Sequence, residues 1–164
     1  MKLVESSAIS KDSFKLLHPS EVFKNECLRI PREGFIAVHV RGGDYLQKNS
    51  DYRELPSDYY RSALNSLGNE VGNLPKWVFT DDQSHAKKVL ASIPNLNFIE
   101  NKSLTAAESM ILMSKAEGIV GANSTFSYWS SVISAKDSSI IFPKNWIKSK
   151  SQSEDFFPIG WQLI

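Results

Sequence analysis

The side chains best suited to chemistry gather at two points of this sequence. The first is the stretch 34–45, where an apolar run rich in β-branched residues contains His39 and ends at Arg41. This pattern predicts a buried strand over 35–40 that runs into a turn. A strand buried on both faces leaves no room for a guanidinium, so Arg41 should emerge at the carboxyl edge of a sheet, where open α/β sheets hold their ligands.

Arg41 has two interpretations that the stretch alone does not separate. The planar guanidinium suits phosphate, and Gly42 and Gly43 allow a ligand to approach the backbone closely, so Arg41 is placed to bind an anion. Alternatively, Arg41 pairs with Asp44 and simply closes the turn.

The second point is the stretch 118–134, in which a short apolar strand runs into Asn123-Ser124-Thr125 and then into a helix that carries Phe126 on its apolar face. Backbone N–H groups at a helix N-terminus are unsatisfied donors at the positive end of the dipole, and flanking hydroxyls add further donors. This pattern predicts a phosphate site, with an ordinary helix cap as the alternative.

The elements that must position these residues alternate along the chain. Helices are predicted at 20–28, 55–67, 83–91, 106–117 and from 125, and strands at 35–40, 76–82, 97–100, 118–122 and 139–143. Such alternation predicts an α/β fold with a Rossmann-like, doubly wound parallel sheet of about five strands. In an order such as 3-2-1-4-5, the first and fourth strands are neighbours, so Arg41 and the hydroxyl-rich helix start would face one crevice.

Several local features accompany these elements. Ser57 and Thr105 are predicted helix caps, and Asp81 or Asp82 is predicted to cap the helix that begins at 83. In the helix over 106–117, one stripe of side chains should be shared by Ala107, Met110, Ile111 and Ser114.

Composition sets limits on the class of protein. With 164 residues and 41% hydrophobic content, one domain is expected, here 34–164 with an N-terminal appendage over 1–33. The 19 basic residues nearly balance 18 acidic ones, which argues against nucleic acid as a partner. The single Cys27 is expected to be a small core residue. The absence of an apolar leader and of a run of about 20 apolar residues predicts a cytoplasmic protein.

Five blocks of the sequence resemble the inverting α-1,2-fucosyltransferase family, in the family's order and spacing. The block 39–45, His-Val-Arg-Gly-Gly-Asp-Tyr, is similar to the family motif His-x-Arg-Arg-Gly-Asp-Tyr. The other blocks are Phe-Thr-Asp-Asp at 79–82, Leu-Met-Ser at 112–114, Ala-Asn-Ser-Thr-Phe-Ser-Tyr-Trp at 122–129 and Ile-Phe-Pro-Lys-Asn-Trp at 141–146. The resemblance covers about 35–146.

The resemblance implies a GT-B glycosyltransferase of which this chain is similar to the C-terminal, donor-binding half. It implies GDP-fucose as donor substrate, no metal or other cofactor, a galactoside-type glycan as acceptor, and a missing N-terminal half that binds this acceptor. It also implies a cytoplasmic place, either free or peripheral at a membrane. The catalytic residues implied are Arg41 and Asp44, and the donor-binding residues are His39, Arg41, Gly42, Gly43, Glu108, Ser109, Asn123, Ser124, Thr125 and Phe126.

Two residues depart from the family pattern. Gly42 stands where the family has its second arginine, which removes a cation beside the diphosphate. Ser109 stands where the family has an aspartate that accepts hydrogen bonds from guanine, and Glu108 precedes it by one residue, about 100° around a helix. These departures keep open the alternative of a non-catalytic nucleotide-sugar-binding or assembly module. A phosphatase-like domain using Asp81 or Asp82 ranks below both.

Overall fold

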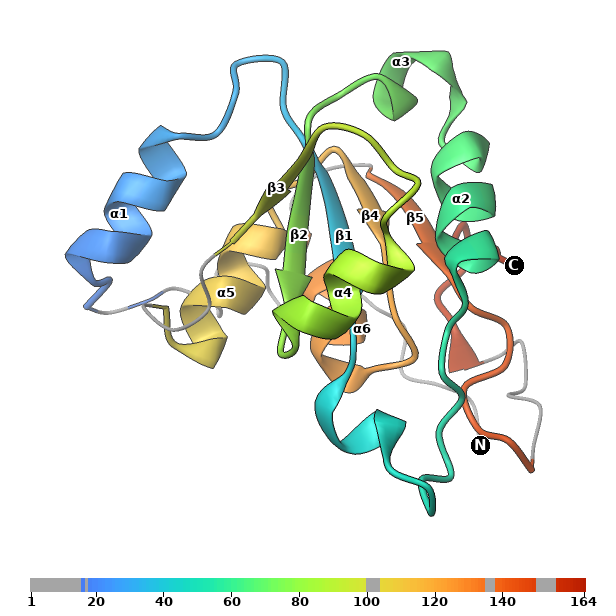
Figure 1. Cartoon of the computed structure of the whole chain (residues 1–164). Coiled ribbons are helices and arrows are strands. Elements are labelled where there is room, and N and C mark those ends of the chain that lie inside the picture. The colour runs from blue at the N-terminus through green and yellow to red at the C-terminus, as the bar shows by residue number, and fades with distance from the viewer. Residues whose placement is uncertain (1–15, 17, 100–103, 135–137, 150–155) are drawn as a thin grey trace.

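A six-stranded, all-parallel sheet forms the centre of the molecule in the computed structural model, which describes residues 16, 18–99, 104–134, 138–149 and 156–164 (Figure 1). The strand order is β3-β2-β1-β4-β5-β6. The strands are β1 (Ile36–Val40), β2 (Lys76–Thr80), β3 (Leu96–Phe98), β4 (Gly118–Val120), β5 (Ser139–Phe142) and β6 (Gln162–Leu163). The predicted Rossmann-like order is confirmed, with β1 and β4 side by side, and β6 extends the sheet beyond the strands predicted.

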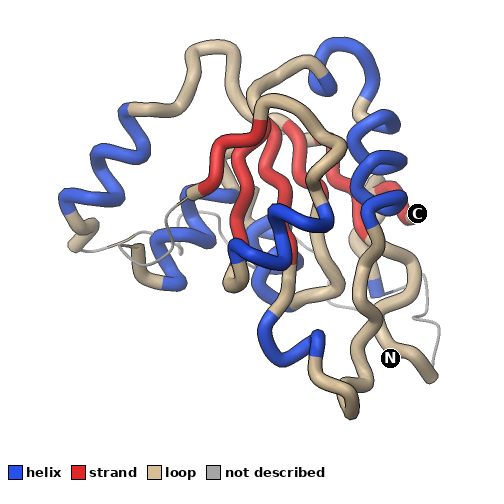
Figure 2. The backbone as a smooth tube through the Cα atoms, viewed as in Figure 1, coloured by secondary structure: helices blue, strands red, loops and turns tan. Residues whose placement is uncertain are grey.

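Helices cover both faces of the sheet, as the predicted doubly wound fold requires (Figure 2). One face carries α2 (Ser57–Ser66), α3 (Gly68–Gly72) and α4 (Gln83–Val89). The other face carries α1 (Glu21–Leu28), α5 (Ala106–Met113) and α6 (Thr125–Val132). A short 3₁₀ turn, η2 (Gly43–Leu46), follows β1 at its carboxyl end.

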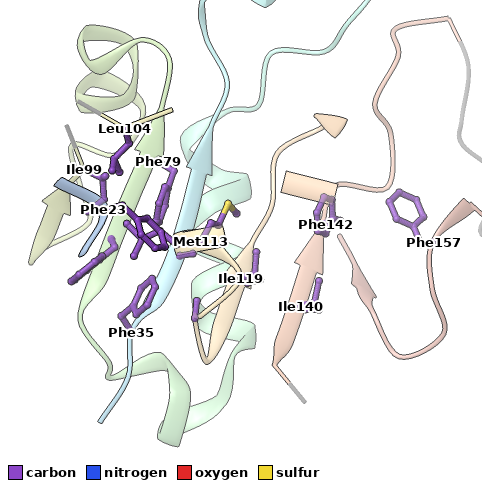
Figure 3. Packing of buried hydrophobic residues seen from close by; sticks show 14 of the residues in the cluster. Phe23, Phe35, Phe79, Ile99, Leu104, Met113, Ile119, Ile140, Phe142 and Phe157 are labelled. Atoms are coloured by element: carbon purple, nitrogen blue, oxygen red, sulfur yellow. The ribbon is translucent and has the colours of Figure 1, made fainter. Parts of the chain in front are cut away.

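The strand β1 is completely buried because it pairs with β2 on one side and β4 on the other. Its side chains alternate between the two faces: Ala37 packs beneath α1, α5 and α6, while Val38 and Val40 pack beneath α2 and α4. Figure 3 shows the first of these clusters, with Phe35, Phe79 and Met113 close together and Phe142 beside Phe157.

Some local predictions were wrong. Pro56, not Ser57, is the N-cap of α2, and it makes no side-chain capping bond. The helix α5 ends at Met113 because Ser114 turns its hydroxyl back onto the carbonyl of Ile111. The stripe predicted for α5 coincides with the buried face only in part. Ser114 is buried and Ile111 packs half-buried against the core, but Ala107 is exposed. The face of the helix that is buried carries Glu108, Ser109, Leu112 and Met113. The hydrogen bond from the N–H of Ser20 to Glu108 turns this other face inward, against α1.

The two ends of the described chain belong to the core. In α1, capped by Ser20 as predicted, Phe23 is buried in the cluster beneath α5, and the half-buried Cys27 packs against it. The C-terminal segment 156–161 leads into β6 and inserts Phe157 beside Phe142, with ring centroids 6.1 Å apart. The division into 1–33 and 34–164 stays a prediction.

No helix in the described part of the chain is long and apolar enough to cross a membrane.

Candidate functional site

Arg41 leaves the sheet at the end of β1 and is held by two carboxylates. Its Nη2 lies 2.7 Å from Oδ1 of Asp44, and its Nη1 lies 2.8 Å from Oδ2 of Asp81. The side chain of Arg41 keeps 30% of its surface exposed, and that of Asp44 keeps 58%. Its Nε atom is buried and has no hydrogen-bond partner in the described part of the chain. The predicted turn-closing pair with Asp44 is therefore present, and it leaves the buried Nε–H of the guanidinium unused.

Asp81 and Asp82, at the carboxyl end of β2, have different tasks. Asp82 caps α4 by accepting the N–H of His85 at 2.9 Å, as predicted for one of the two aspartates. Asp81 instead accepts the N–H of Gly42 at 2.8 Å through Oδ1, while its Oδ2 pairs with Arg41. One carboxylate thus fixes both the turn and the guanidinium.

The two glycines of the turn are required by space and by backbone conformation. A Cβ on Gly42 would lie 2.7 Å from Cβ of Asp82, a distance that side chains do not tolerate. Gly43 has φ +51°, and a Cβ there would lie 2.9 Å from Oδ2 of Asp81. The glycine in place of the family's second arginine therefore fits a turn that packs tightly on the end of β2.

His39 lies two residues before Arg41 and only 4% of its surface is exposed. Its Nδ1 has no hydrogen-bond partner among the residues that the structure describes, and its ring lies 5.1 Å from the ring of Phe126, at the start of α6. Burial, and secondarily the charge of Arg41, lowers the pKa of His39 to about 3, so the imidazole is neutral at ordinary pH.

The N-terminus of α6 lies beside the end of β1, as predicted. Ser124 is the N-cap, with its hydroxyl accepting the N–H of Phe126 at 3.3 Å, and Thr125 is exposed as the first helical residue. Asn123 lies just before this cap, and its donor-binding role stays a prediction. Its side-chain amide donates to the carbonyls of Arg53 and Trp146, at 2.8 and 2.9 Å, so it holds loops rather than pointing to a ligand.

Glu108 and Ser109 lie at the first turn of α5 and are both buried. The carboxylate of Glu108 forms a capping box with Thr105, accepting its N–H at 2.9 Å and its hydroxyl at 3.0 Å. It also accepts the N–H of Ser20 at 2.7 Å. Hydrogen bonds from the backbone of Thr105 and then of Ser20 lower the pKa of Glu108 to about 2.

The structure therefore brings together the end of β1 and the start of α6, and sequence reasoning missed two residues there. Asp81 was assigned to capping, although its place after the strand next to β1 could have revealed its partner. Tyr45 was given no role, yet its hydroxyl donates to the carbonyl of Asn123 at 3.1 Å. Among the described residues, no group of three or more His, Cys, Asp or Glu could hold a metal ion.

Comparison with known proteins shows the family of this chain. The family description "Glycosyl transferase family 11" matches residues 22–164. The chain is 27% identical over 151 residues to the O-antigen biosynthesis glycosyltransferase WbnK of Escherichia coli, covering 89% of this chain and 49% of that protein. It is 31% identical over 139 residues to an alpha-1,2-colitosyltransferase of Escherichia coli, covering 79% of this chain and 47% of that protein. The chain thus spans about half the length of these curated relatives, and it belongs to glycosyl transferase family 11, the α-1,2-fucosyltransferase family.

Proposed function

We propose that this chain is the donor-binding half of a glycosyltransferase that moves a fucosyl or colitosyl group from a GDP-sugar to a galactoside-type glycan. The observation that carries the proposal is the pair of buried polar atoms without partners, His39 Nδ1 and Arg41 Nε, beside the start of α6. Buried polar atoms are normally paired, so a ligand that supplies oxygen atoms at this edge would complete them. Family membership and the name of the colitosyltransferase relative support the same chemistry.

The diphosphate of the donor would lie between Arg41 and the N-terminus of α6. In an inverting transfer, the bond from the anomeric carbon to the phosphate oxygen breaks as the acceptor hydroxyl attacks, and negative charge grows on the departing GDP. Arg41 and the amide of Thr125 would stabilise this charge, whereas the N–H of Ser124 already donates to the carbonyl of Ala122 at 2.7 Å. The acceptor hydroxyl loses its proton to a base.

Asp44 is suited to yield its place on Arg41 when the diphosphate arrives. Its side chain is the more exposed of the two carboxylates on Arg41, whereas Asp81 is also tied to the backbone of Gly42. A diphosphate that displaced Asp44 would leave a free carboxylate next to the reacting atoms while Asp81 kept the guanidinium in place. This exchange supports a catalytic part for Asp44 as well as for Arg41.

The site is proposed to discriminate only weakly between guanine and other nucleotide bases. Both oxygens of the Glu108 carboxylate accept hydrogen bonds within the protein, so Glu108 has no free oxygen to replace the family's aspartate toward guanine. GDP and UDP should then bind within about tenfold of each other, or about 1.4 kcal/mol.

Titration calorimetry with GDP in EDTA tests the site. Arg41→Ala should weaken GDP binding by about 1.5–3 kcal/mol, the scale of a charged hydrogen bond. Arg61→Ala is the matched control, because Arg61 pairs with Asp58 on the exposed surface of α2. No binding of GDP at millimolar concentration, or equal affinity for the Arg41→Ala variant, would contradict the proposal.

Transfer itself should need a second half that holds the acceptor, because donor and acceptor must meet in one reactive geometry. Labelled GDP-fucose and a galactoside should give no fucosylated product with these 164 residues alone, and product once an acceptor half is supplied. Product from the 164 residues alone would contradict the proposal that this chain binds the donor and a second half binds the acceptor. GDP binding without transfer in the completed protein would favour the non-catalytic alternative.

A further inference from the structure

Tyr45 touches both parts of the proposed donor site. The guanidinium carbon of Arg41 lies 5.2 Å from the centre of its ring, within the range of a cation–π contact. At the other end of the same side chain, the hydroxyl donates to the carbonyl of Asn123 at 3.1 Å. Asn123 immediately precedes Ser124, the N-cap of α6. The ring therefore spans the distance from Arg41 to the start of this helix.

The anchor at Asn123 is itself fixed. Its amide group donates to the carbonyls of Arg53 and Trp146, which belong to two different loops. These loops are joined by a bridge between Tyr52 and Ile147. A hydrogen bond to the carbonyl of Asn123 is thus a bond to a residue whose side chain is tied to two loops.

The ring of Tyr45 is also held by stacking. The ring of Tyr52 lies 4.2 Å from it with an angle of 8° between the planes. Burial raises the pKa of the Tyr45 hydroxyl to about 12, so this group keeps its proton and remains a donor at ordinary pH. The edge of the Arg41 guanidinium thus pairs with Asp44 and Asp81, and its face lies over the ring of Tyr45, which stacks on Tyr52.

We propose that Tyr45 is a positioning residue that sets the spacing between Arg41 and the N-terminus of α6, and so the fit of a nucleoside diphosphate between them. The inference rests on the proposed donor site. It predicts that the Tyr45 hydroxyl acts on ligand affinity through Arg41, which a residue with a purely structural role would not do.

A double-mutant cycle on GDP affinity measures this dependence. Tyr45→Phe removes only the hydroxyl and should weaken GDP binding about three- to tenfold. In the Arg41→Ala background, the same substitution should change GDP affinity less than twofold, because the group that it positions is gone. Tyr59→Phe is the matched control, since the Tyr59 hydroxyl also donates to a carbonyl of the loop before α6, that of Gly121 at 2.6 Å. It should leave GDP affinity within twofold.

A second pair of variants tests the stacking of Tyr52 on Tyr45 without changing Tyr45. Tyr52 is partly exposed, so its replacement should leave the protein folded. Tyr52→Ala should weaken GDP binding, and Tyr52→Phe, which keeps the stacked ring, should not.

The outcomes separate this inference from the function it rests on. If Arg41→Ala weakens GDP binding but Tyr45→Phe does not, or does so equally in both backgrounds, the positioning role is overturned and the donor site stands. If Arg41→Ala has no effect on GDP affinity, both the proposed donor site and the positioning role of Tyr45 are overturned.

Discussion

The carboxyl end of β1 and the first turn of α5 both carry residues that the family resemblance implied for donor binding, yet their polar groups are in opposite states. At α5, the carboxylate of Glu108 accepts three hydrogen bonds from Thr105 and Ser20. At β1, Arg41 Nε and His39 Nδ1 are the buried side-chain polar atoms that lack a partner among the described residues.

This difference shows that residue type alone does not distinguish a side chain that stabilises the fold from one that binds a ligand. Glu108 already has the partners that a ligand would offer, so its bonds join α1 to α5 and stabilise the fold. The end of β1 keeps two buried nitrogen atoms unpaired among the described residues, at a cost in stability that a bound ligand would remove. Substitutions at β1 should therefore alter binding, and substitutions at α5 should alter stability alone.

The largest effect is expected from Gly42→Arg, which restores the family's residue. The Cβ would lie 2.7 Å from Cβ of Asp82, so the free energy of unfolding should fall by about 3 kcal/mol, near the upper end for overpacking. GDP affinity should fall rather than rise, because Asp81 would lose its bond to the turn. Urea unfolding and calorimetry measure both quantities.

Gly72→Ala is the control for that substitution. A Cβ there meets only the carbonyl oxygen of Leu64 at 3.7 Å, an ordinary contact, so stability should not fall. A Gly42→Arg protein as stable as the native one, with tighter GDP binding, would show that the turn moves freely and that the site is less rigid than described.

A second effect, on pH dependence, concerns His39. Its pKa is lowered from 6.5 to about 3, so below pH 6.5 the unfolded chain takes up a proton that the folded protein does not. The free energy of unfolding therefore decreases as the pH falls from 6.5 toward 3. At pH 5, about 1.5 units below 6.5, this amounts to about 2 kcal/mol at about 1.4 kcal/mol per unit.

The measurement is urea unfolding at pH 7 and pH 5 of the native protein and of His39→Gln. The variant should lack that loss of about 2 kcal/mol, whatever its stability at pH 7. The same decrease in both proteins would mean that the His39 ring is not buried as a neutral group, and the contrast with α5 would weaken.

A smaller effect is expected at α5 from Thr105→Ala. The variant loses the hydroxyl that caps the helix and donates to Glu108, so the free energy of unfolding should fall by about 1 kcal/mol. GDP affinity should not change. Ser66→Ala, which removes an exposed hydroxyl bonded within α2, should change stability by less than about 0.5 kcal/mol. Weaker GDP binding by Thr105→Ala would place α5 in the donor site after all.

No effect at all is expected of Glu108→Ala on the preference between GDP and UDP, although the protein should melt at a lower temperature. The reason is that the carboxylate is already engaged by Thr105 and Ser20. A strong preference for GDP in the native protein that disappeared in this variant would show that Glu108 reads guanine, and the comparison would have to be reversed.

Much of the fold could be predicted from the sequence because the apolar strands and the helix caps are local signals. The alternation of strands and helices led to the order β3-β2-β1-β4-β5, and Ser20, Thr105 and Asp82 cap helices as expected. The sixth strand was missed because β6 has two residues, too few to show a period.

The site was predicted less completely, since its bonds join residues far apart in the chain. The places of Arg41 and of the start of α6 could be predicted from the strand order. The hydrogen bond between Asp81 and the N–H of Gly42 could not, because it joins residues 39 positions apart in the sequence. In the same way, the local sequence around Asn123 indicates only a helix cap. Its hydrogen bonds to Arg53 and Trp146 could not be predicted, because those residues are distant in the sequence.

Asn123 also bears on the order in which the molecule folds. Its two bonds reach back 70 positions to Arg53 and forward 23 positions to Trp146, so neither can form until the strands between them have been paired. Contacts of such sequence separation carry a large loop-closure cost and belong to the late part of a folding reaction. The crevice between β1 and α6 should therefore be among the last regions to form and, in hydrogen exchange, among the first to open, while the strands beneath it are still protected.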